Sequence, residues 1–130
     1  MKNLLVIDDS EINLYLVEAI FSDDPDINVV LIWDSRKALE KIKQIQPEMI
    51  LLDLMMPHID GYQILYQMKT DPDLSDIPVV ILSARHDDES VKKAMEYGAA
   101  DYIKKPINSF KLKYIIHNLM KTYSKKPSLK

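Results

Sequence analysis

The chain has 130 residues, of which 47% are hydrophobic, and this is sufficient for one domain with a single core. Its 17 Lys and Arg residues and 20 Asp and Glu residues give a formal net charge of -3, so nothing in the overall charge indicates nucleic acid or an anionic membrane surface. The absence of cysteine excludes disulfides and thiolate metal sites, and no stretch approaches the roughly 20 apolar residues of a membrane helix, so we expect a cytoplasmic protein.

Five short apolar runs predict five β-strands, at residues 4–7, 27–33, 49–52, 79–82 and 102–103. Each run is followed by a segment with helical spacing of its apolar residues, at 12–20, 38–45, 64–68, 91–95 and 112–119. Candidate helix caps lie near four of the helix starts, and a glycine lies where the fourth helix should end: Ser10, Ser35, Asp60, Asn108 and Gly98. Because most of the runs do not alternate with polar residues, we expect helices to cover both faces of a parallel sheet.

The alternation of strands and helices predicts an α/β fold, a doubly wound five-stranded parallel sheet. We take the strand order 2-1-3-4-5 from flavodoxin-like folds, in which strands one and three meet at a ligand crevice. Residues 1–122 are assigned to this domain. The lysine-rich residues 123–130 are interpreted as a basic tail or linker stump.

Polar residues follow four of the five predicted strands. Asp8 and Asp9 follow the first strand, Asp53 the third, Ser83 the fourth and Lys105 the fifth. The carboxyl ends of parallel strands lie at one edge of a sheet, so we expect these side chains to converge. Two carboxylates about 4 Å apart repel by about 4 kcal/mol at an effective dielectric constant near 20, which calls for cations. Lys105 supplies one, and Mg²⁺ with its oxygen ligands suits the rest.

A carboxylate beside such a cation is a suitable nucleophile toward phosphorus. Phosphoryl transfer depends mainly on positioning and on neutralising the oxygens of the transferred group. The Lys105 ammonium, the Ser83 hydroxyl and the metal would each take one of these oxygens. The pattern therefore predicts a site for an aspartyl phosphate.

The chain resembles the receiver domain of two-component response regulators from Leu4 to about Met120. No single matching motif is decisive, but the intervals between the polar residues at the strand ends are those that the family uses. The motifs are Val-Ile-Asp-Asp at 6–9, Leu-Leu-Asp-Leu-Met-Met-Pro at 51–57, Asp-Gly at 60–61, Val-Ile-Leu-Ser-Ala at 80–84, Gly-Ala-Ala-Asp-Tyr at 98–102 and Lys-Pro at 105–106.

The resemblance implies a metal site and a phosphoacceptor. Asp8 and Asp9 would hold Mg²⁺ directly or through water, Asp53 would be the phosphoacceptor, and the backbone carbonyl of Met55 would complete the protein ligands. Met55 and Arg85 occupy two positions that vary among relatives and are thought to tune the lifetime of the phosphorylated state.

The resemblance also implies a switch. Ser83 and Lys105 would contact the phosphoryl oxygens, and a cis bond would join Lys105 to Pro106. Ser83 would be drawn toward the phosphoryl group, and Tyr102 would turn inward and reshape the face formed by the fourth helix, the fifth strand and the fifth helix.

The implied partners are a histidine kinase or phosphotransfer protein as donor, and a downstream protein that binds the switching face; a homodimer is left open. In this reading the protein is not an enzyme but a switch that assists its own phosphorylation and dephosphorylation. We expect no direct contact with nucleic acid and none with a membrane.

Three alternatives are weighed against a receiver. A phosphatase of the haloacid-dehalogenase type would carry an acid two residues after its aspartyl nucleophile, where this chain has Met55. A binding module that has lost phosphorylation would lack an acid or the lysine, and none is missing. A dinucleotide-binding domain would need a glycine-rich loop after the first strand, but the two glycines are Gly61 and Gly98.

Overall fold

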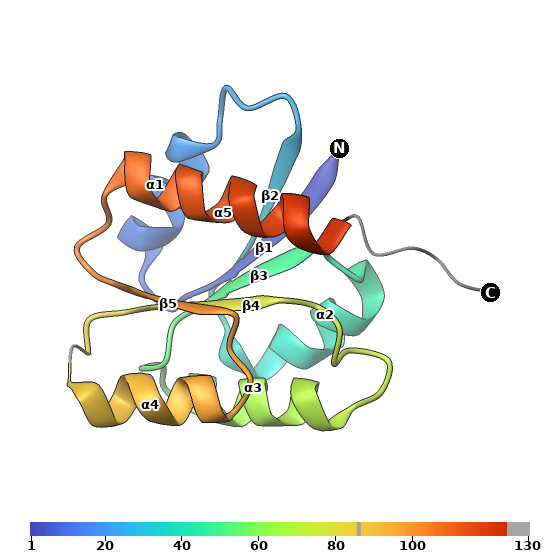
Figure 1. The fold of residues 1–130 in the computed structure, drawn as a ribbon, viewed down its shortest axis with the longest axis vertical. Helices are drawn as coiled ribbons and strands as arrows, with labels where there is room; N and C mark the ends of the chain where they lie inside the picture. Colours follow the sequence, from blue (N-terminus) through green and yellow to red (C-terminus); the bar gives the residue numbers. More distant parts are fainter. Residues whose placement is uncertain (86, 125–130) are drawn as a thin grey trace.

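The computed structural model describes residues 1–85 and 87–124 (Figure 1). The five strands form one parallel sheet in the order β2-β1-β3-β4-β5, which confirms the predicted α/β fold and strand order. The elements in chain order are β1 (Lys2–Ile7), α1 (Glu11–Ile20), β2 (Ile27–Ile32), the short 3-10 helix η1 (Ser35–Lys37), α2 (Ala38–Ile45), β3 (Met49–Leu52), α3 (Gly61–Thr70), β4 (Val79–Ser83), α4 (Asp88–Glu96), β5 (Asp101–Lys104) and α5 (Ser109–Ser124).

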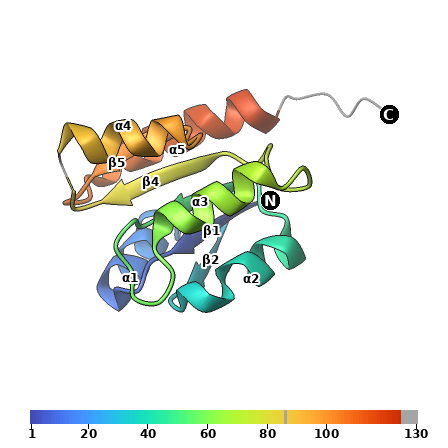
Figure 2. The same cartoon turned by 90° about the horizontal axis from the view of Figure 1, so that it is seen from below.

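The sheet is the middle of three layers. Helices α1 and α5 cover one face, and α2, α3 and α4 cover the other (Figure 1). Figure 2 views the second face and shows the three helices side by side across it. Along β1, Leu4 and Val6 belong to the core under α1 and α5, whereas Leu5 and Ile7 belong to the core under the other helices. Alternate side chains of a strand point to opposite faces, and here both faces are buried, which explains the unbroken apolar runs.

Three of the predicted helix caps are confirmed. The side chains of Ser10, Asp60 and Asn108 each accept a hydrogen bond from the backbone N–H three residues later, at the starts of α1, α3 and α5. Gly98 follows the end of α4 with φ of 103°, a conformation that suits glycine. These caps fix where the loops at the edges of the sheet begin and end.

Ser35 does not have the capping role expected from the sequence. Asp34 caps η1, since its carboxylate accepts the Arg36 N–H at 3.0 Å, and α2 begins only at Ala38. The Ser35 hydroxyl instead donates to the carbonyl oxygen of Pro57 at 2.7 Å. This residue therefore fastens the loop between β3 and α3, which carries part of the candidate site.

The predicted domain boundary at residue 122 falls within α5, which runs to Ser124. Residues 125–130 of the predicted basic tail lie outside the described residues, so the tail stays a prediction. In the described ranges, 1–85 and 87–124, none of the helices is long and apolar enough to cross a membrane.

Candidate functional site

Three aspartates meet at the carboxyl ends of β1 and β3. One carboxylate oxygen from each of Asp8, Asp9 and Asp53 lies within 4.8 Å of the others. The register of the two strands explains this convergence, because Ile7 lies beside Leu52 and the next residues of both strands reach the same edge. Asp8 and Asp53 are buried, whereas Asp9 is exposed. The structure thus brings together the three acids that the sequence indicated.

Lys105 enters the same site from the end of β5. Its Nζ lies 3.0 Å from Asp8 Oδ2 and 3.6 Å from Asp53 Oδ2, and only 15% of its side chain is exposed. The backbone N–H of Lys105 donates to the carbonyl oxygen of Ser83 at 2.8 Å, which ties the lysine to the end of β4. The bond from Lys105 to Pro106 is cis, as expected. One ammonium among three carboxylates leaves an excess of negative charge.

The electrostatics of Asp53 reflect this excess. Burial, followed by repulsion from Asp8, raises the pKa of Asp53 from 3.8 to about 6. The nearby Lys105 ammonium and the Met55 N–H, which donates to Asp53 Oδ1 at 3.3 Å, act in the opposite direction without cancelling the rise. A divalent cation would relieve the repulsion, and carboxylate oxygens are the ligands that Mg²⁺ prefers.

Asp8 is held by hydrogen bonds to both of its oxygens. The backbone N–H of Ser10 donates to Oδ1 at 2.9 Å, while Lys105 donates to Oδ2 at 3.0 Å. Sequence reasoning gave Ser10 only the role of a helix cap. In turns, an aspartate side chain often accepts a hydrogen bond from the backbone N–H two residues later. Asp8 directly after a strand is therefore the local signal for this contact. Ser35, by contrast, reaches the site's loop from 22 residues away, and no local motif marks it.

Gly61 allows the loop after β3 to fold back onto Asp53. Its N–H donates to the carbonyl oxygen of Leu54 at 3.0 Å. A Cβ atom at this position would lie 2.7 Å from Leu54 Cα and closer still to the carbonyl oxygen of Asp53. Both neighbours are backbone atoms, so a larger residue would push the loop away from Asp53.

Ser83 and Tyr102 both form hydrogen bonds with the backbone of Arg85, in the loop between β4 and α4. The fully buried Ser83 accepts a hydrogen bond from the Arg85 N–H at 3.2 Å, and the Tyr102 hydroxyl donates to the Arg85 carbonyl at 3.0 Å. Burial raises the pKa of Tyr102, and the Ser83 side chain moderates the rise. The two residues expected to form the switch are therefore linked through Arg85.

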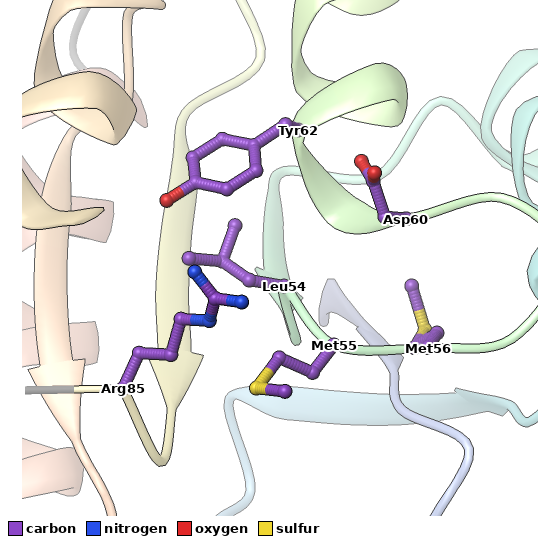
Figure 3. Close-up of a pocket in the computed structure, with 6 residues that line it drawn as sticks. All are labelled: Leu54, Met55, Met56, Asp60, Tyr62 and Arg85. Atoms are coloured by element: carbon purple, nitrogen blue, oxygen red, sulfur yellow. The ribbon is translucent and has the colours of Figure 1, made fainter.

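An open pocket of about 360 Å³ is lined by Leu54 and Met55, the two residues that follow Asp53 (Figure 3). Met55 and Arg85, the two positions expected to tune the phosphorylated state, both contribute to its walls, and Figure 3 shows the Arg85 side chain extended toward Leu54 and Tyr62. The full lining is Leu54, Met55, Met56, Asp60, Tyr62 and Arg85.

These features define a class of protein: a doubly wound parallel α/β domain with an acidic, lysine-containing crevice at the carboxyl ends of its central strands. A family model described as response regulator receiver domain matches residues 4–117. The chain belongs to this family.

Relatives and solved structures agree with this assignment. The chain is 36% identical over 109 residues to the response regulator PleD of Caulobacter vibrioides, which covers 84% of this chain and 24% of that protein. The signal receiver domain of a signal transduction histidine kinase from Syntrophus aciditrophicus superposes with a TM-score of 0.88 at 26% identity, covering 100% and 98% of the two chains. The Mn²⁺-bound form of the response regulator Rcp1 superposes with a TM-score of 0.81 at 27% identity, covering 100% and 99%. The chain thus spans about a quarter of the curated relative and nearly all of the two solved chains.

Proposed function

We propose that this receiver domain accepts a phosphoryl group on Asp53 in a Mg²⁺-dependent reaction. The donor would be a histidine kinase, a phosphotransfer protein or a small phosphodonor. The observation that carries the proposal is the convergence of Asp8, Asp9 and Asp53 with the Lys105 ammonium at one edge of the sheet. Membership of the receiver family supports it.

The acidic cluster suits Mg²⁺. Asp8, Asp9 and Asp53 each offer an oxygen, and the backbone carbonyl of Met55 is the proposed fourth protein ligand. When bound, the cation would neutralise charge on the acids and on the transferred group. The response regulator Rcp1, which shares this fold, has been crystallised in a Mn²⁺-bound form, and this supports a divalent cation here.

The chain's own residues can carry out the remaining steps. One oxygen of Asp53 attacks phosphorus, a P–O bond forms, and the bond between phosphorus and the donor's leaving group breaks, with its electron pair remaining on the leaving group. Because the pKa of Asp53 is about 6, this carboxylate is mostly ionised at neutral pH. Lys105 would move its hydrogen bond from the acids to a phosphoryl oxygen, and Ser83 would donate to another. The reaction is stoichiometric, so the domain acts as a switch and not as an enzyme toward an external substrate.

The output would pass through the face formed by α4, β5 and α5. The hydrogen-bonded chain from Ser83 through Arg85 to Tyr102 connects the proposed phosphorylation site with β5. A shift of Ser83 toward the phosphoryl group changes the surroundings of the Tyr102 hydroxyl, and this supports a switching role for Tyr102. The partner on that face would be a downstream protein or a second copy of the domain.

Intact-mass measurement after incubation with acetyl phosphate and Mg²⁺ tests the proposal. The wild-type protein should gain one phosphoryl group, and Asp53→Asn should gain none. Asp73→Asn, at an exposed aspartate in the loop between α3 and β4, is the matched control and should be labelled like the wild type. Undiminished labelling of Asp53→Asn, or turnover of an external phosphate ester, would contradict the proposal.

A further inference from the structure

Arg85 contacts three parts of the switch at once. Its backbone N–H donates to the Ser83 hydroxyl at 3.2 Å, and its carbonyl accepts from the Tyr102 hydroxyl at 3.0 Å. Its side chain reaches in a third direction, with Nη1 donating to the Ser90 hydroxyl of α4 at 3.4 Å. A single residue therefore joins β4, β5 and the first turn of α4.

Ser90 is a structural centre of that first turn. It is buried, and its N–H and hydroxyl both donate to the carboxylate of Asp87, the N-cap of α4, at 2.8–2.9 Å. Its carbonyl oxygen accepts from the Tyr62 hydroxyl of α3 at 3.1 Å. The hydrogen bonds from Ser90, assisted by the charge of Arg85, hold the pKa of Asp87 below its usual range. The Arg85 side chain thus supports the cap that starts α4.

The same side chain lines the pocket that also includes Leu54 and Met55, the two residues after the phosphoacceptor. Arg85 and Met55 line this pocket together (Figure 3). The Met55 N–H donates to Asp53 Oδ1 at 3.3 Å. Met55 and Arg85 lie in the loops that follow β3 and β4, two strands that are neighbours in the sheet and run about 4.8 Å apart. The guanidinium carries forked donors that match phosphoryl oxygens, and an anionic acceptor binds it more strongly than a neutral hydroxyl does.

We infer that Arg85 is a positioning residue that exchanges partners on phosphorylation, leaving Ser90 for an oxygen of the phosphoryl group on Asp53. This inference rests on the proposed function. The exchange removes the support of Arg85 from Ser90 and Asp87, and the first turn of α4 loosens. Phosphorylation is thereby transmitted to α4 through a side chain, separately from the backbone contacts that join Ser83 to Tyr102.

The test follows the Ser90 amide proton by hydrogen exchange in NMR, with and without acetyl phosphate and Mg²⁺, while intact mass reports the labelled fraction. In the wild type, labelling should accelerate this exchange about fivefold, the factor that corresponds to about 1 kcal/mol. In Arg85→Ala the exchange should already be fast without label and should not change at a matched labelled fraction. Arg85→Lys, which keeps the charge without the fork, should show a reduced response. Lys92→Ala, an exposed charge change on α4, is the control and should respond as the wild type does.

Three results would overturn the inference. A labelled wild-type protein whose Ser90 amide does not exchange faster would show that α4 is not loosened. An Arg85→Ala variant that accelerates as much as the wild type at the same labelled fraction would show that another residue transmits the change. A wild-type protein that gains no mass would refute the proposed function, and the inference would fall with it; the mass measurement distinguishes this case from the first two.

Discussion

The negative charge on Asp53 should lower the free energy of unfolding when no divalent cation is bound. Burial and the repulsion from Asp8 raise the pKa of Asp53 from 3.8 to about 6 in the folded state. Between these two values the folded protein binds more protons than the unfolded chain, so the free energy of unfolding falls as the pH rises through this window. The loss is complete above about pH 6 and absent below about pH 4.

The size of the loss follows from the two pKa values. A difference of about two pH units, at about 1.4 kcal/mol for each, corresponds to about 3 kcal/mol. The crevice opens to solvent beside the exposed Asp9, so water screens part of the charge on Asp53 and we expect about 2 kcal/mol. Asp53→Asn keeps the shape of the side chain and removes its charge. The variant should therefore be more stable than the wild type by about 2 kcal/mol at about pH 7.5.

Urea unfolding followed by circular dichroism, in the presence of a chelator, measures this difference. The advantage of Asp53→Asn should shrink toward zero as the pH is lowered to about 4, and adding Mg²⁺ should stabilise the wild type more than the variant. Asp73→Asn should stay within about 0.5 kcal/mol of the wild type at both pH values. The reasoning is refuted if Asp53→Asn is no more stable than the wild type near pH 7.5, or if its advantage grows in acid.

Three further substitutions test how the site is held. Lys105→Met leaves Asp8 and Asp53 buried without their ammonium partner. It should lower the free energy of unfolding by about 2 to 3 kcal/mol near pH 7.5, and unchanged urea unfolding would contradict this. Gly61→Ala places a Cβ against the backbone of Asp53 and should lower the free energy of unfolding by about 2 kcal/mol. It should also weaken Mg²⁺ binding in a calorimetric titration, and wild-type affinity would contradict the close approach. Asp60→Ala removes the capping box of α3 and should lower the thermal midpoint by an amount equivalent to about 1 kcal/mol, whereas an unchanged midpoint would show that the cap is dispensable.

Much of the fold could be predicted from the sequence, because apolar runs and helical spacing are local patterns. The central strands β1, β3 and β4 are almost entirely buried, and their runs were correspondingly clear. The edge strand β5 was predicted from two residues only, since Asp101 and Lys104 at its ends are polar. The strand order had to come from flavodoxin-like folds, because a local pattern does not say which strands are neighbours. The role of Ser35 was missed for the same reason, since its partner Pro57 is distant in the sequence.

The acids of the candidate site could be predicted because parallel strands bring their carboxyl ends to one edge. The sequence did not distinguish Asp8 from Asp9, although the first is buried and the second is exposed. This difference depends on the turn in which the Ser10 N–H binds Asp8, and hence on the conformation of a loop. The contact between Arg85 and Ser90 likewise depends on a loop and a helix start that no motif encodes.

The arrangement that makes the site unstable without a cation is also what the proposed reaction needs. A nucleophilic carboxylate must be ionised, within reach of the donor and unable to move away from its neighbours. The close approach of Gly61 to the Asp53 backbone and the hydrogen bond from the Met55 N–H to the Asp53 carboxylate both limit how far Asp53 can move away from Asp8. If Mg²⁺ binds as proposed, relief of the repulsion between Asp8 and Asp53 contributes to its binding free energy. Mg²⁺ binding, folding stability and the ionisation of Asp53 must then all change together with pH.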